Sequence, residues 1–279
     1  MAAGRQRREF LRVLRNEKAE LSDRLLAAEM GGNLVAINDE LAEALLSIVG
    51  RRDQPEELRA RAAISLGPAL EQADLDEFED LESVPISEGM FHKIVNTLRM
   101  LYADTSIPKE VRRRILEGSV RAPQGWHRQA IRAAWSSGDE DWTLTAVFAM
   151  RWVRGFDREI LEALISSNPD IHYEAVCAAG SSELDAAWPH VAALITSEDT
   201  DKDLLLAAIE AAPSIRPAET GALLADLADS ADEDIAEAAQ EAIEMARGQL
   251  EFEQGEDDEF EDEDGFDDED DGEGNVYRQ

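Results

Sequence analysis

The stretch "NPDIHYEAVCAAG" (168–180) brings together His172, Tyr173, Glu174 and Cys177, whose side chains can bind a metal, attack an electrophile or transfer a proton. Cys177 is the only cysteine of the chain, so a zinc site would lack a second thiolate. His172 and Cys177 are five residues apart, which places them on different faces of a helix. A cysteine nucleophile would also need a histidine or cation beside it. We therefore predict no catalytic residue, no metal and no cofactor.

Ordinary helix signals explain the same stretch. Asn168 suits an N-cap, Pro169 suits the first helical position and Gly180 suits the helix end. Along the chain, apolar residues recur at intervals of three and four, and short Gly, Pro, Asp or Ser breaks separate the segments. This pattern predicts a series of short amphipathic helices with few strands.

Six of these helices superpose without gaps. They cover residues 58–67, 111–120, 142–151, 171–180, 204–213 and 235–244, and their starts are 53, 31, 29, 33 and 31 residues apart. Position 5 is small in five of them and position 8 in all six, which lets neighbouring helices pack closely. A repeat of this period predicts an all-α solenoid built from helix pairs.

The domain organisation follows from this repeat. We predict a basic N-terminal helix over 1–30, a solenoid over 31–250 with an acidic loop inserted at 71–89, and a disordered acidic tail over 251–279. The tail holds 16 acidic residues and one arginine, so it cannot bury enough apolar surface to fold.

Two segments, "PEELRARAAISLG" and "NPDIHYEAVCAAG", resemble the second helix of HEAT repeats, in particular the bacterial HEAT-like class first named for phycobilisome lyases. The resemblance covers roughly residues 31–246 and implies a right-handed α-solenoid of about six helix pairs. The arginine of the family pattern is kept at Arg59 and Arg112. Thr143, His172, Leu205 and Ala236 replace it elsewhere. The family includes scaffolds, chromophore lyases and DNA repair enzymes, so the resemblance is specific for fold rather than function.

Composition limits which partners and which compartment we expect for this chain. The formal net charge is -35, which on average repels nucleic acid. A lone cysteine forms no internal disulfide, and no stretch near the N-terminus combines a basic region with an apolar core and a cleavage site. No apolar run reaches the ~18 residues that a membrane span needs. We expect a cytoplasmic monomer without a membrane partner.

The repeat register also predicts a binding surface. Positions 3, 7 and 10 point away from the core; they look solvated in the flanking units, as at Arg113 and Glu117, but are largely apolar in the middle units. An apolar stripe over three helices would form the floor of a groove, unless other helices cover it. The predicted protein-binding residues are Leu144, Phe148, Arg151, Trp152, Arg154, Tyr173, Cys177 and Leu206.

The preferred functional hypothesis is a non-enzymatic HEAT-repeat scaffold that binds an unidentified protein through its concave face, because no phosphate loop, GxSxG, HExxH or dinucleotide motif is present. A first alternative is nucleic-acid association through the central arginines, with the acidic tail as competitor. These arginines are Arg112, Arg113, Arg128, Arg151 and Arg154. A second alternative is a lyase-like accessory activity, which requires a groove open to small ligands.

Overall fold

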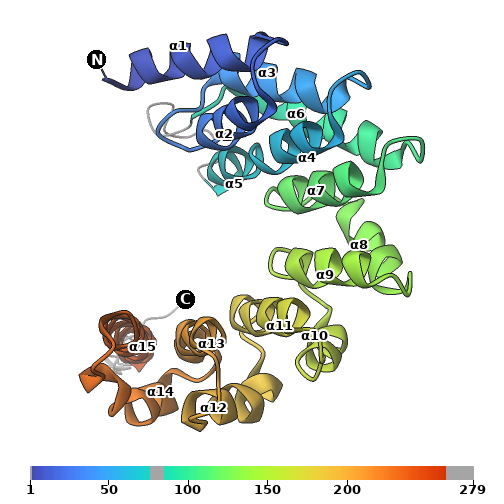
Figure 1. Cartoon of the computed structure of the whole chain (residues 1–279). Coiled ribbons are helices and arrows are strands. Elements are labelled where there is room, and N and C mark those ends of the chain that lie inside the picture. The colour runs from blue at the N-terminus through green and yellow to red at the C-terminus, as the bar shows by residue number, and fades with distance from the viewer. Residues whose placement is uncertain (1, 76–84, 262–279) are drawn as a thin grey trace, which may run out of the picture. The chain divides into compact units, whose positions relative to one another are not determined.

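A computed structural model describes residues 2–75 and 85–261 of the 279-residue chain. Every regular element in these ranges is a helix, and successive helices pack in antiparallel pairs (Figure 1). The predicted all-α solenoid is therefore confirmed. None of the helices in these ranges has the length and apolar character that crossing a bilayer requires.

The chain divides into two compact units, the first ending at Ala187. In the first unit, α4, α7, α9 and α11 pack one on the next in a single layer, with the other helices beside them (Figure 1). Its elements are α1 (Ala2–Arg15), α2 (Leu21–Gly31), α3 (Asp39–Gly50), α4 (Glu56–Ile64), α5 (Gly67–Leu75), α6 (Glu88–Ala103), α7 (Lys109–Ser119), α8 (His127–Trp135), α9 (Glu140–Ala149), α10 (Asp157–Ala163), α11 (Pro169–Ser181) and the 3-10 turn η1 (Asp185–Ala187).

The second unit begins at Trp188. It contains α12 (Trp188–Thr196), α13 (Lys202–Ile215), α14 (Pro217–Leu224), the 3-10 turn η2 (Leu227–Asp229) and α15 (Glu233–Glu261). Within it, α13 packs on α12 and α15, and α14 packs on α15. Helix α15 continues past Glu251, where the tail was predicted to begin, because glutamate is a good helix former and an existing helix extends at little cost. The rest of the predicted tail, 262–279, lies outside the described residues.

The small residues of the repeat lie in the core, as the register predicts. Position 5 is fully buried in all six helices, at Ala62, Ile115, Ala146, Ala175, Ala208 and Ala239. Position 8 is buried as well, and at Gly118 the packing is tightest: a Cβ atom there would lie 2.5 Å from the carbonyl oxygen of Ala63. The α4–α7 contact therefore requires glycine at this position.

Buried or half-buried arginines join the two helices of a pair. Each one hydrogen-bonds a carbonyl oxygen ten residues earlier, at the end of the preceding helix, where backbone acceptors lack intrahelical partners. The bonds run from Arg24 to Leu14 (3.1 Å), from Arg59 to Val49 (2.9 Å) and from Arg112 to Tyr102 (2.9 Å). Arg24 makes the same contact between α1 and α2, and the predicted single N-terminal helix over 1–30 is in fact a helix pair.

Lysine side chains join successive pairs. Each lysine is the first residue of its helix and contacts two aspartates, 30 and 32 residues later, at the start of the next helix of the layer. Lys109 lies 2.6 Å from Asp139 and 2.7 Å from Asp141, and Lys202 lies 2.8 Å from Asp232 and 2.5 Å from Asp234. The same contact thus occurs once in each unit.

The predicted loop over 71–89 is only partly correct. Its first residues belong to α5, which ends at Leu75, and its last residues begin α6 at Glu88. Helix α5 was missed because Pro68 suggests a break, although proline is well tolerated in the first turn of a helix. Residues 76–84 lie outside the described residues.

Candidate functional site

Two adjacent hollows lie over the layer formed by α4, α7, α9 and α11. The larger, about 500 Å³, is lined by Glu56, Glu57, Ala60, Arg61, Ile64, Glu110 and Arg114. The smaller, about 250 Å³, is lined by Ile64, Arg114, Glu117, Leu144, Phe148, Asp170, Tyr173 and Glu174. Because Ile64 and Arg114 line both, we treat them as one feature and call it the cleft.

The cleft contains part of the predicted binding surface. Leu144, Phe148 and Tyr173 come from α9 and α11 and form its apolar wall. Tyr173 is exposed, whereas Leu144 and Phe148 are half-buried. The apolar stripe of the middle units is therefore open over these three residues.

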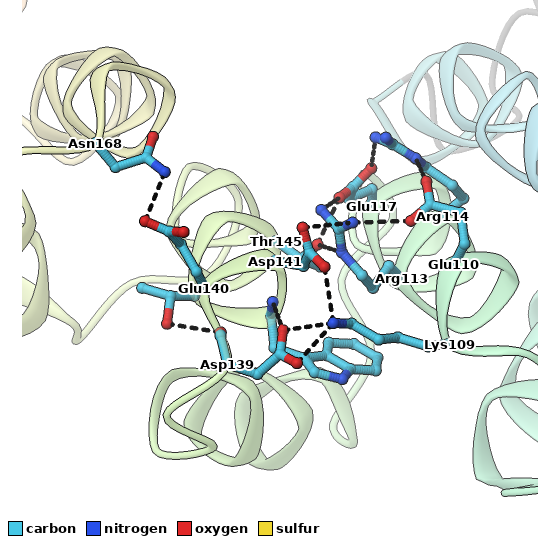
Figure 2. Close-up of polar contacts among 12 residues, drawn as sticks. Lys109, Glu110, Arg113, Arg114, Glu117, Asp139, Glu140, Asp141, Thr145 and Asn168 are labelled. Atoms are coloured by element: carbon cyan, nitrogen blue, oxygen red, sulfur yellow. Dashed lines mark hydrogen bonds and ion pairs between the residues drawn. The ribbon is translucent and has the colours of Figure 1, made fainter.

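A buried network of charges lies between α7 and α9, and of its members Glu117 lines the smaller hollow. Figure 2 shows these side chains pointing toward one another. Arg113 donates from Nε to the Thr145 hydroxyl (2.9 Å), which donates to Glu117 (2.6 Å). Arg113 and Glu117 were predicted to be solvated, and this is wrong: both are buried. The next helix of the layer covers them, and burying opposite charges is tolerable when they are paired and hydrogen-bonded.

Arg114 is fixed by two carboxylates where the two hollows meet. Its Nε donates to Glu110 at 2.7 Å, and its Nη1 donates to Glu117 at 2.6 Å (Figure 2). The guanidinium is therefore neutralised by its own helix. Over the whole cleft, six carboxylates face two guanidinium groups, so the cleft carries net negative charge.

Glu174 is the carboxylate that the packing satisfies least. Its side chain is only 18% exposed, and Oε2 has no hydrogen-bond partner among the described residues. The Arg151 guanidinium lies 3.6 Å away, which is an ion pair but too long for a hydrogen bond. Burial raises the pKa of Glu174, and Arg151 offsets part of that rise. A carboxyl group with a raised pKa keeps its proton to a higher pH than an ordinary glutamate does, and groups perturbed in this way can take part in proton transfer.

Two arginines stack on a pair of aromatic rings beside the cleft. The Phe148 and Trp152 rings lie 4.9 Å apart, and the Arg121 and Arg151 guanidinium groups each lie 5.1 Å from the centre of the Trp152 ring. Trp152 and Arg121 also donate hydrogen bonds to Glu71 of α5, at 3.0 and 2.9 Å. Glu71 therefore ties α5 to the wall of the cleft.

The remaining predicted site residues lie elsewhere. Arg154 is exposed and pairs with Glu183 at 2.9 Å. Cys177 is half-buried and does not line the cleft. Leu206 belongs to the second unit, so a stripe continuing from Tyr173 to Leu206 stays a prediction.

The central arginines are largely committed to contacts within the protein. Arg113 is buried, and Arg151 pairs with Glu174. Arg112 bonds a backbone carbonyl and stacks 5.2 Å from the Tyr102 ring and 5.5 Å from the Trp142 ring. A phosphate backbone would have to break these contacts, which weakens the case for a central nucleic-acid site.

A serine and a histidine also approach each other, but not as a nucleophile and its base. The Ser119 hydroxyl lies 3.0 Å from His127 Nε2, and the Gln124 amide donates to His127 Nδ1 at 2.8 Å. Since Nδ1 accepts, Nε2 carries the proton of the neutral ring and donates to Ser119. Burial lowers the pKa of His127 to about 4, so the ring stays neutral and cannot take the serine proton through Nε2.

Among the side chains that the structure describes, no three histidine, cysteine or acidic groups lie together so as to hold a metal ion.

The cleft could be found from the sequence only in part. The spacing Glu110, Arg114, Glu117 places alternating charges on one helix face, and this is a readable signal. Nothing in the sequence indicates that Asp170 and Glu174 of another repeat face Arg114, because that depends on how α11 stacks on α9.

The chain matches no family model and no curated protein. It is similar to a solved structure of human deoxyhypusine hydroxylase in complex with glycerol, at 17% identity over 89% of this chain and 98% of that chain, with a TM-score of 0.38. It is also similar to an engineered protein, at 18% identity over 74% of this chain and 96% of that chain, with a TM-score of 0.44. A third similar structure is YibA of E. coli, at 17% identity over 88% of this chain and 81% of that chain, with a TM-score of 0.43. Deoxyhypusine hydroxylase and YibA are HEAT-repeat-like all-helical proteins, and a likeness at such identities concerns the fold alone.

The comparison corrects one prediction. Deoxyhypusine hydroxylase is an enzyme by its name, which contradicts our inference that a HEAT-like solenoid without familiar motifs is a non-enzymatic scaffold. We withdraw that inference.

Proposed function

We propose that the chain has a modifying, lyase-like activity of the kind expected from the bacterial HEAT-like class, and that its substrate binds in the cleft. The observation that carries this proposal is Glu174. Its carboxyl is mostly buried, has a raised pKa and lines the smaller hollow, and its buried Oε2 makes no hydrogen bond. Groups perturbed in this way are common where proton transfer occurs.

The lining of the cleft favours a cationic substrate with an apolar part. Glu56, Glu57 and Asp170 make no ion pair with the described residues, so their charges are available to a ligand. Phe148 and Tyr173 offer aromatic faces, which attract cations and pack against apolar groups. The open hollows also meet the requirement that the lyase-like alternative set.

In this proposal Glu174 is the acid–base group. As a carboxylate it accepts a proton from the bound substrate, and as a carboxylic acid it returns one. Arg151, at 3.6 Å, stabilises the charged form and so keeps the proton exchangeable. Arg114 and the carboxylates that hold it form the rigid wall against which the substrate is positioned.

Benzylamine is a suitable probe, because its protonated form joins a cation to an aromatic ring. We expect calorimetry to detect binding to the full chain and to show an affinity at least about tenfold lower for Glu174→Gln, as loss of a charge-assisted contact implies. The matched control is Glu162→Gln, which changes an exposed carboxylate on α10. Equal affinity in Glu174→Gln and Glu162→Gln would refute the assignment of Glu174.

We also propose a cytoplasmic location, because the lone thiol of Cys177 forms no disulfide with its own chain and suits a reducing compartment.

A further inference from the structure

The first helix displays a row of arginines on one face. Arg5, Arg8, Arg12 and Arg15 follow one another at intervals of three, four and three residues, which is the spacing of a single helix face. All four are exposed. At a rise of about 1.5 Å per residue the row is roughly 15 Å long. We call it the arginine row.

The opposite face of α1 is anchored in the protein. Leu11 and Leu14 are buried in the core of the first unit, and α1 packs on α2 and α3. Arg7 also donates from Nε to the backbone oxygen of Ala36 at 2.7 Å. The helix is thus a fixed platform, and its apolar face is not free to enter a lipid layer.

The arginine row is largely free to bind a ligand. Arg5 and Arg8 make no ion pair with the described residues. Arg12 pairs with Glu9 and Arg15 with Glu40, but these pairs are well exposed, and such pairs contribute little and exchange readily.

The outer face of α1 is positively charged, which solubility alone does not require. A terminal helix of a solenoid needs a polar outer face for solubility, and either sign of charge would serve. The chain has 62 acidic and 27 basic residues, yet α1 carries five arginines and a single glutamate. In an otherwise acidic protein this concentrates attraction for anions on one helix.

We propose that the arginine row binds the phosphate backbone of a nucleic acid. Guanidinium groups bind phosphates through two parallel hydrogen bonds, and a duplex presents about one charge per 1.7 Å, more than an acidic peptide can. The contact would be to the backbone and without base sequence preference. It is separate from the cleft and from the central arginines considered above.

The test measures binding of a fluorescein-labelled double-stranded DNA of about 20 base pairs to the full chain, by anisotropy, at about 50 and 200 mM salt. Arg5→Gln/Arg8→Gln should bind about tenfold more weakly and show a salt slope smaller by about 1.8, because two phosphate contacts are lost. The control Arg128→Gln/Arg158→Gln removes the same charge from exposed positions elsewhere in the unit and should change neither value appreciably.

The competing ligands are tested in parallel. Equal weakening by the two double variants, or no DNA binding at the lower salt concentration, would overturn the proposal. Binding of poly-glutamate or of anionic phospholipid vesicles in place of DNA would overturn it as well. None of these results bears on the cleft, which benzylamine binding tests independently.

Discussion

Glu117 and Glu174 line the same hollow but differ in what holds them. Glu117 is buried, accepts hydrogen bonds from Thr145 and Arg114, and completes the contact between α7 and α9. Glu174 has a distant cation and one oxygen without a hydrogen bond. The charge of Glu117 therefore stabilises the packing of α7 against α9, whereas the charge of Glu174 destabilises the folded state.

Stability measurements should separate these two roles. Glu117→Gln should lower the free energy of unfolding by about 3 kcal/mol, because Arg113 and Arg114 lose a buried partner. Glu174→Gln should leave the stability at neutral pH unchanged or slightly higher, since a carboxyl with a raised pKa costs free energy once it is ionised. Chemical denaturation of both variants decides the point. A large loss of stability in Glu174→Gln would mean that this residue is structural.

His127 makes the fold sensitive to acid. Its pKa is about 4 in the folded chain and about 6.5 when unfolded, so the unfolded state binds more protons between these values. The contribution is fully present above about pH 6.5 and is lost as the pH falls toward 4.

Denaturation at about pH 7 and about pH 5 should therefore show a loss of roughly 2 kcal/mol that depends on His127. His127→Gln should lack this part of the pH dependence, whereas the exposed control His92→Gln should keep it. If all three proteins lose the same stability, His127 is not the titrating group.

At the level of elements, the sequence predicts the ladder helices well because their small residues recur at fixed positions. It fails where the next repeat decides the environment. Arg113 and Glu117 occupy positions that look solvated, yet they are buried because α9 stacks on them. The carboxyls of the cleft come from different repeats, so no local pattern brings them together.

Gly118 offers a direct test of the close contact between α4 and α7. A Cβ atom at this position would meet backbone atoms of Ala63 and Ile64, which cannot move aside as a flexible side chain can. Gly118→Ala should therefore cost about 1–3 kcal/mol of unfolding free energy, as overpacking generally does. Gly89→Ala, which meets nothing within 4 Å, should show no loss. Equal stability of the two variants would contradict the packing described for Gly118.

For the molecule as a whole, charge is the dominant surface property. A net charge of -35 destabilises the folded chain through self-repulsion, and salt screens that repulsion. The exposed ion pairs would be weakened by salt, but each contributes little. We therefore expect the melting temperature to rise between about 10 and about 150 mM NaCl, as followed by circular dichroism. A fall over this range would show that ion pairs outweigh repulsion.

The central claim is that Glu174 exchanges a proton within a cation-binding cleft, and the pH dependence of benzylamine binding tests it most directly. Between about pH 4 and about pH 8 the probe stays protonated, so affinity should rise as Glu174 ionises, with a midpoint above that of an ordinary glutamate. In Glu174→Gln this rise should be absent. An affinity that follows the same pH profile in the wild-type chain and in Glu174→Gln would contradict the claim.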